Sequence, residues 1–278
     1  MIRVVAAVVL ALGLLTGCSG ADEPAADQTP TATPTSTPEP TPAEPAPRPD
    51  VGACYDLAYD EAIAPTSDRK AVPCKTEHTA QTVHVGQLDT VVDGHLVAVD
   101  SERVQRQVAS SCPEQMAAFV GGTAEDLELS MLSAVWFSPT VEESDGGQNW
   151  YRCEVVALAG RQQLSPLKAS MKGILATQEG RDSFGMCGTD RPGTQGFERV
   201  PCARDSSWRA ISTVDVPAGR NGTWPGAEAA KAADGDTCKD AVRDEADDPL
   251  KFTWSYEWPT KKQWQAGQHH GFCWAPTS

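Results

Sequence analysis

Basic residues are scarce in this sequence, and long apolar runs are absent. The 278 residues include 23 Lys and Arg against 38 Asp and Glu, which gives a formal net charge of −15. No run of Lys or Arg is longer than a pair such as Lys261-Lys262. A chain this acidic repels phosphate backbones, so we expect no nucleic-acid partner. No stretch reaches the ~20 apolar residues of a membrane-spanning helix, so we expect none in the mature protein.

Signatures of common enzymes and metal sites are also missing. There is no G-x-S-x-G, H-E-x-x-H or P-loop sequence. Ser165-Pro166-Leu167-Lys168 spells the S-x-x-K motif of penicillin-binding proteins, but the accompanying S-D-N and K-T-G motifs are absent. We therefore expect no catalytic residue, no cofactor and no metal. The acidic segment 240–248 should be a solvated face; calcium binding is the alternative, although the spacing matches no known loop motif.

The N-terminus has the form of a lipoprotein signal peptide. One positive charge precedes a 12-residue apolar run, Val4 to Leu15, which is too short to span a membrane. The run ends at Leu15-Thr16-Gly17-Cys18, which resembles the bacterial lipobox. The resemblance implies that residues 1–17 are cleaved off and that Cys18 carries a diacylglycerol thioether. The membrane would then be a partner through a lipid anchor on the extracytoplasmic face. A plain signal peptide with an incidental cysteine is the alternative.

Residues 18–50 form a proline-rich segment that cannot build a core. Nine prolines alternate with Thr, Ala and Glu between Ser19 and Asp50, and no large apolar residue is present. Proline fixes φ and lacks an N–H donor, so we expect a disordered, extended tether. At ~3.1 Å per residue the tether could reach on the order of 100 Å from the membrane.

From residue 51 onward the sequence repeats itself. Each half contains the tripeptides G-x-C and V-P-C in the same order, followed by two further cysteines. The eight cysteines are Cys54, Cys74, Cys112 and Cys153 in the first half, and Cys187, Cys202, Cys238 and Cys273 in the second. This pattern predicts two tandem domains, 51–160 and 181–278, joined by a polar linker over 161–180.

An ungapped match precedes the last cysteine of each half. Pro139-Thr140 stands 14 residues before that cysteine in the first half, and Pro259-Thr260 stands 14 residues before it in the second. Both threonines open a capping-box pattern, Thr140 with Glu143 and Thr260 with Gln263. A short helix that ends at a glycine should follow each threonine.

The rest of each half is typical of an α+β domain. Period-two patterns predict strands within 72–88, 132–136 and 151–159, and again within 200–216, 252–256 and 272–275. A stripe of Val104, Val108, Cys112 and Met116 predicts a helix capped by Asp100 or Ser101, which Pro113 should break or kink. Cys238, Val242 and Ala246 repeat that stripe. We expect each half to be a short antiparallel sheet packed with one or two helices and stapled by disulfides.

Disulfides are favoured over zinc for the eight cysteines. An exported protein is exposed to oxidants, and no two cysteines have the C-x₂-C spacing of zinc sites. Four cysteines allow three pairings in each half. Chain order and short loops favour Cys54 with Cys74, Cys112 with Cys153, Cys187 with Cys202, and Cys238 with Cys273.

This arrangement resembles the septum-formation domain family of exported proteins in high-GC Gram-positive bacteria. The resemblance rests on Gly52-x-Cys54, on Val72-Pro73-Cys74 followed by Glu77-His78-Thr79-Ala80, on Cys112, and on the run from Pro259 through Trp264 and Gly267 to Cys273. The second half lacks the His78 segment, and the first half has Ser144 where Trp264 is expected. The family name implies a role in cell division or envelope biogenesis, and no established catalytic chemistry.

Together these features favour a non-catalytic binding or scaffolding module of the cell envelope. His78, Trp258 and Trp264 are the candidate binding-surface residues, although most tryptophans of this segment should be core. An envelope or division protein and cell-wall glycan are the candidate partners. One alternative is a small-ligand sensor, which predicts an apolar pocket between the halves. Another is a wall-modifying enzyme, which predicts a cleft with convergent acid and base residues.

Overall fold

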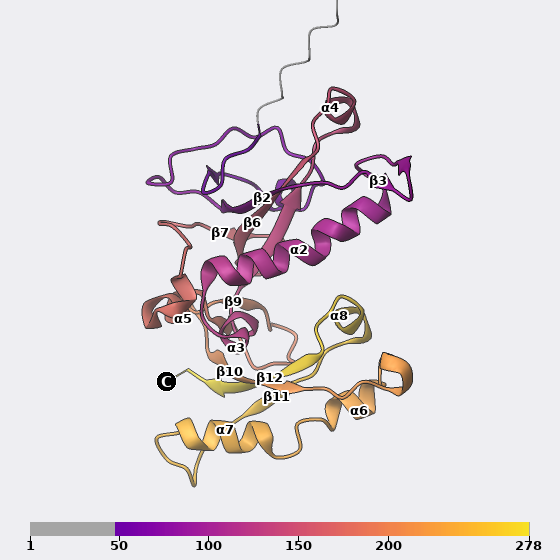
Figure 1. Ribbon diagram of the computed structural model, residues 1–278. Helices are drawn as coiled ribbons and strands as arrows, with labels where there is room; N and C mark the ends of the chain where they lie inside the picture. The colour runs from indigo at the N-terminus through magenta and orange to yellow at the C-terminus, as the bar shows by residue number, and fades with distance from the viewer. Residues whose placement is uncertain (1–47, 278) are drawn as a thin grey trace, which may run out of the picture. The chain divides into compact units, whose positions relative to one another are not determined.

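The computed structural model describes residues 48–277 (Figure 1). The predicted signal peptide, the predicted lipid-attachment residue Cys18 and most of the predicted tether lie outside the described residues. Within 48–277, no helix is long and apolar enough to cross a membrane. The described chain combines helices with antiparallel sheets, which confirms the predicted α+β class.

The first sheet is built around its longest strand, β6 (Trp150–Leu158). β2 (Ala80–Gln87) pairs with one side of β6 and β5 (Leu132–Phe137) with the other, both antiparallel. With β1 (Cys54–Tyr55) on the outer side of β2, the order is β1-β2-β6-β5. The short strand β7 (Leu164–Ser165) pairs with the end of β6.

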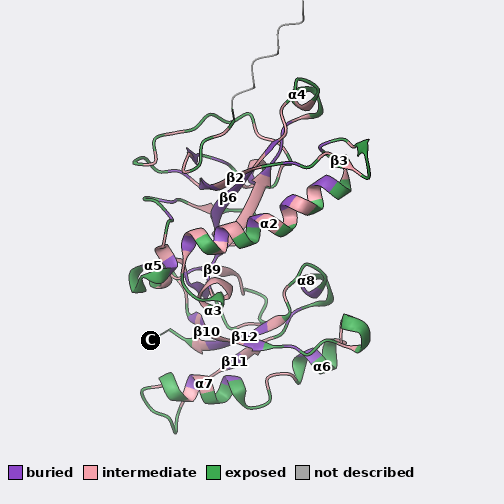
Figure 2. Ribbon diagram, in the orientation of Figure 1, coloured by how far each residue is buried: buried purple, intermediate pink, exposed green. Residues whose placement is uncertain are grey.

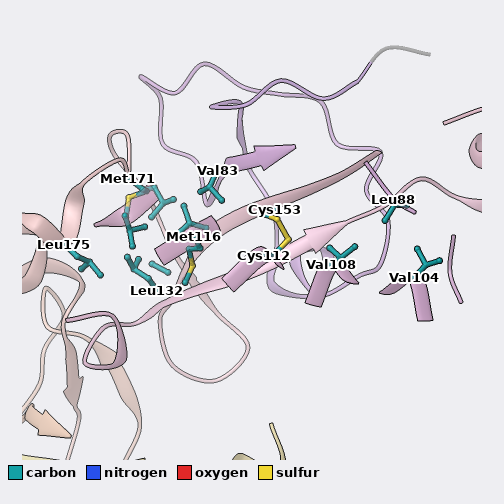
Figure 3. Packing of buried hydrophobic residues seen from close by; sticks show 14 of the residues in the cluster. Val83, Leu88, Val104, Val108, Cys112, Met116, Leu132, Cys153, Met171 and Leu175 are labelled. Atoms are coloured by element: carbon teal, nitrogen blue, oxygen red, sulfur yellow. A yellow bond between two sulfur atoms is a disulfide. The ribbon is translucent and has the colours of Figure 1, made fainter. Parts of the chain in front are cut away.

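Helix α2 (Glu102–Val120) covers one face of this sheet (Figures 1 and 2). Its buried stripe extends the predicted one by a turn and consists of Val104, Val108, Cys112, Met116 and Val120. The stripe packs against Val83, Leu132 and Cys153 of the strands (Figure 3). The helix continues through Pro113, so the proline does not break it, which was one of the two predicted outcomes. Side chains on both sides of the proline are buried against the sheet, and this burial offsets the missing backbone hydrogen bond.

The opposite face of the first sheet is covered by the segment after β1, which includes α1 (Tyr59–Ala62). Tyr55, Leu57 and Ala62 pack there against Phe137, Trp150 and Val156. The smaller elements of the first half are the hairpin of β3 (Val91–Val92) and β4 (His95–Leu96), α3 (Ala124–Glu128) and α4 (Val141–Asp145). The first half therefore has a covered sheet with two separate apolar clusters.

The second sheet has the strand order β11-β12-β10-β8-β9. Its strands are β8 (Met186–Gly188), β9 (Arg199–Pro201), β10 (Trp208–Asp215), β11 (Ser255–Glu257) and β12 (His270–Pro276). Four of them, in the order β8-β10-β12-β11, follow the same chain order as β1-β2-β6-β5. The strand predicted over 252–256 is shorter than expected, because β11 begins at Ser255 and Trp254 packs beside the Cys238–Cys273 disulfide.

Helix α7 (Thr237–Glu245) packs on the second sheet through Cys238 and Val242, and its other side is exposed (Figure 2). The second half also contains η2 (Arg220–Gly222), α6 (Ala227–Lys231) and α8 (Lys261–Gln265). Both predicted capping boxes are present. The backbone N–H of Thr140 donates to Glu143 at 2.8 Å, and that of Thr260 donates to Gln263 at 2.8 Å. These hydrogen bonds cap the N-termini of α4 and α8, which stand at matched positions in the two halves.

Four disulfides link the eight cysteines of the described chain. The pairs are Cys54–Cys74, Cys112–Cys153, Cys187–Cys202 and Cys238–Cys273, which are the pairs that chain order favours. In each half one disulfide closes the turn after the first strand, and the other joins the covering helix to the last strand. Each disulfide therefore fixes a helix or a loop to its own sheet.

Residues 161–180 pack more tightly than a polar linker would. Leu167, Met171 and Leu175 are buried in the core beneath α2. Gln81 accepts a hydrogen bond from the backbone N–H of Met171 at 2.8 Å. The polar composition of the segment conceals this packing, which depends on the space beneath α2. The chain continues through η1 (Ile174–Ala176) and α5 (Gln178–Phe184) into the second half.

The two halves share an apolar cluster. Met131 of the first half packs with Met186, Trp208, Phe272 and Trp274 of the second. Backbone hydrogen bonds from Met131 to Phe184 and from Met186 to Leu129 join the same region at 2.8 and 2.7 Å. The second sheet thus buries one face against α7 and the other against residues of the first half.

Candidate functional site

The three candidate surface residues lie in different surroundings. His78 is fully buried, so its prediction as part of a binding surface is wrong. Its backbone pairs with Leu167, and its Nδ1 lies 2.8 Å from the carbonyl oxygen of Thr76. The polar residues next to His78 in the sequence give no sign of this burial, because its partner Leu167 lies 89 positions further along the chain. His78 supports the packing of segment 161–180.

Trp264 lies at the wall of a cleft in the second half. The capping box of Thr260 starts α8, and this short helix turns the Trp264 side chain toward the apolar residues Val216 and Ala230. The ring of Trp224 stands edge-on to it at 5.6 Å between centroids, and the ring of His269 lies over it at 4.3 Å. Trp264 is buried, Trp224 is half-buried and His269 is exposed. We call these three rings the aromatic cleft.

The aromatic cleft has a volume of about 530 Å³, and its remaining lining is polar. Lys261 and Gln265 contribute from α8, and Thr223 contributes from the opposite side. Among the described residues Lys261 takes part in no ion pair. A cation and an amide beside aromatic rings suit a ligand that has both apolar faces and polar or acidic substituents.

Trp258 is the exposed tryptophan of this region, with 37% of its surface accessible. The ammonium group of Lys231 lies 5.6 Å from the centre of its ring, within the range of a cation–π contact. Lys231 belongs to α6, and Ala230 of the same helix packs against Trp264. Helix α6 therefore connects Trp258 to the aromatic cleft.

Tyr256 holds α6 in place. Its hydroxyl donates to the carbonyl oxygen of Ala230 at 3.1 Å. Burial, together with the charge of Asp234, raises the pKa of Tyr256 to about 12, so the hydroxyl keeps its proton and remains a donor. The ring crosses β12 at Gly271, where a Cβ would approach Tyr256 to 2.4 Å. Glycine is therefore required at this strand position for the tyrosine to reach α6.

The first half has no equivalent of the aromatic cleft at its matching helix. Helix α4 has the same capping box as α8, but Ser144 stands where α8 has Trp264. Val141 is its exposed apolar residue. The two halves therefore differ at this position in the chemistry that they offer to a ligand.

A buried ion pair on β6 is a feature that sequence reasoning missed. Arg152 Nε lies 3.0 Å from Glu154 Oε1, and the two residues are 3% and 0% exposed. The guanidinium lies 4.1 Å from the centre of the Tyr55 ring and 4.8 Å from that of Phe137. Burial raises the pKa of Glu154 to about 7, although Arg152 and Thr82 lower it. Two charges within an otherwise apolar strand are the signal that could have revealed the pair.

A cluster of polar contacts lies where the halves meet. His270 Nδ1 is 3.5 Å from Glu128, and the neighbouring Arg199 pairs with Glu257 at 2.9 Å. Burial lowers the pKa of His270, partly offset by the nearby carboxylates. In the described part of the chain no three His, Cys, Asp or Glu side chains are grouped to hold a metal ion.

Comparison with known proteins supports one family. The model of the family described as "Septum formation" matches residues 28–144 and residues 52–273. Neither the curated proteins nor the solved structures gave a match. Because the second range spans most of the chain and includes both sheets, the protein belongs to the septum-formation family.

Proposed function

We propose that this protein is a lipid-anchored, non-catalytic binding module of the cell envelope, which contributes to septum formation by binding wall glycan. Family membership supports the link to the septum. Four disulfides are typical of a protein that works outside the reducing cytoplasm. The lipobox-like sequence before Cys18 supports anchoring at the membrane.

The aromatic cleft carries the proposal for a glycan partner. Sugar rings offer apolar C–H faces, which pack on the rings of Trp224 and His269 at the mouth of the cleft. Their hydroxyl groups suit the amide of Gln265, and acidic substituents of a wall strand suit the ammonium of Lys261. Trp258, beyond α6, offers a further exposed ring to an extended strand.

We also infer that the two halves are tandem copies of one domain. Their four common strands follow the same order, and each half has one disulfide near its first strand and one on its covering helix. The capping boxes of α4 and α8 stand at matched positions. On this basis the second copy is the binding domain, and the first copy supports it through the shared cluster around Met131.

The adjacent lysines of α8 provide the test of glycan binding. Lys261 lines the aromatic cleft and Lys262 does not. We expect Lys261→Ala to weaken binding to purified wall glycan strands about fivefold, the effect of ~1 kcal/mol for an exposed charged contact. Lys262→Ala removes the same charge and serves as the matched control. Equal binding by both variants, measured by co-sedimentation with insoluble wall, contradicts the proposed site.

The anchor has a separate test. The Cys18→Ala variant removes the thiol to which the lipid would attach. We expect this variant to be released from the membrane fraction and to lose incorporation of labelled fatty acid. A variant that is still lipid-labelled and still sediments with membranes refutes the anchor without affecting the glycan proposal.

A further inference from the structure

A second cavity, of about 580 Å³, lies where the segment after β7 meets α5 and the turn that follows Cys202. Its apolar lining consists of Leu164, Pro166, Met171, Ile174 and Phe184, with three alanines between them. Pockets of ~300–1,000 Å³ with mainly apolar walls are the usual size for small-molecule sites. The site lies at the junction of the two halves, and the proposed glycan contact does not use it. We call it the junction pocket.

Backbone hydrogen bonds and a disulfide hold three segments that line or adjoin the junction pocket. β7 is hydrogen-bonded to β6, where Ala157 pairs with Ser165. Leu167 exchanges backbone hydrogen bonds with His78. The turn that carries Ala203 and Arg204 follows directly on the Cys187–Cys202 disulfide. A ligand therefore meets a site that is already formed, which lowers the entropy cost of binding.

The charged groups of the junction pocket are mainly cationic. Lys168 and Arg204 line it, against a single carboxylate, Glu179. Arg204 donates through Nη1 to the carbonyl oxygen of Ala159 at 2.8 Å, which holds the guanidinium beside the apolar wall. Within residues 48–277, Lys168 forms no ion pair. In a protein with a net charge of −15, two cations beside an apolar wall favour an anion at this place.

We propose that the junction pocket binds an amphipathic anion with a single hydrocarbon chain, of the fatty-acid class. The chain packs against Leu164, Met171 and Phe184, and the carboxylate pairs with Lys168 and Arg204. The hydroxyl groups of Ser165 and Ser170 line the same pocket as further donors. This site and its ligand are independent of the aromatic cleft and of the proposed glycan partner.

Calorimetric titration with laurate tests the proposal. The full chain carrying Cys18→Ala is used, so that no covalent lipid competes for the site. We expect saturable binding of one laurate per chain and little binding of dodecylammonium, which has the same chain length and the opposite charge. Lys168→Gln should weaken laurate binding about tenfold, the loss of one hydrogen bond to a charged group. Lys172→Gln is the matched control, because Lys172 does not line the pocket.

A second variant tests the apolar wall. Ala169 is an exposed residue of the lining, so Ala169→Trp fills the junction pocket without disturbing the core. We expect it to abolish laurate binding while the circular dichroism spectrum and thermal midpoint are unchanged. The proposal is overturned by absence of saturable laurate binding, by equal affinity for dodecylammonium, by equal effects of Lys168→Gln and Lys172→Gln, or by full binding in Ala169→Trp. Glycan binding should be unchanged in Lys168→Gln, Lys172→Gln and Ala169→Trp.

Discussion

Replacing Glu154 by glutamine should change how the stability of this protein depends on pH. Glutamine has the shape of a protonated glutamate and cannot ionise. Burial raises the pKa of Glu154 from 4.5 to about 7 in the folded chain, even with Arg152 beside it at 3.0 Å. Folding therefore favours the protonated carboxyl. This contribution to stability is complete below pH 4.5 and is lost as the pH rises through 7.

The size of the effect follows from the two pKa values. The rise from 4.5 to about 7 corresponds to about 3 kcal/mol, since one pH unit is worth ~1.4 kcal/mol. The Glu154→Gln variant lacks this pH-dependent contribution to stability, because its amide does not ionise. The wild-type free energy of unfolding minus that of Glu154→Gln should therefore fall by about 3 kcal/mol between pH 4 and pH 8.

The assay is equilibrium unfolding in guanidinium chloride with the four disulfides intact, followed by tryptophan fluorescence at several pH values. Glu257→Gln is the matched control, because it removes the same group from an Arg–Glu pair of 2.9 Å whose side chains are 22% and 21% exposed. A difference between the unfolding free energies of the wild type and of Glu154→Gln that stays constant or rises with pH would contradict a raised pKa of Glu154.

Three further predictions concern other parts of the fold. Gly271→Ala places a Cβ against the Tyr256 ring. We expect unfolding measurements to show a loss of ~1–3 kcal/mol of stability, and we expect weaker glycan binding. Unchanged stability and binding would contradict the role of Tyr256 in holding α6. Trp258→Ala should weaken glycan binding a few-fold at an unchanged thermal midpoint, and a destabilised variant would show a core role instead. Replacing both Cys54 and Cys74 by serine should cost ~2–4 kcal/mol, whereas an unchanged unfolding midpoint would mean that this disulfide does not constrain the chain.

The sequence allowed the local features of the fold to be predicted. The spacing of Thr140 and Glu143 predicts a capping box because both partners lie within one helical turn, and the structure contains it. Burial of the stripe from Val104 to Met116 follows in the same way from helical periodicity. Consecutive cysteines along the chain pair with each other, because each disulfide joins segments that are adjacent in the sheet or packed on it.

Features that depend on distant residues were not predictable. His78 is polar and stands in a polar segment, and only its pairing with Leu167 buries it. The burial of segment 161–180 depends on the space beneath α2, which no local pattern reveals. Trp264 was identified as a candidate, but the cleft also needs Trp224 and His269, which the fold brings to it. The sequence therefore pointed to one residue of the candidate site and not to its shape.

On the proposed function, the aromatic cleft brings this protein to the growing septum. Fluorescence microscopy of dividing cells that produce the full-length chain, as wild type, as Lys261→Ala with Gln265→Ala, or as Lys262→Ala, measures this most directly. We expect septal enrichment of the wild type and of Lys262→Ala, and uniform membrane fluorescence of the double variant at the same total amount of protein. Septal enrichment of the double variant equal to that of the wild type would contradict the claim.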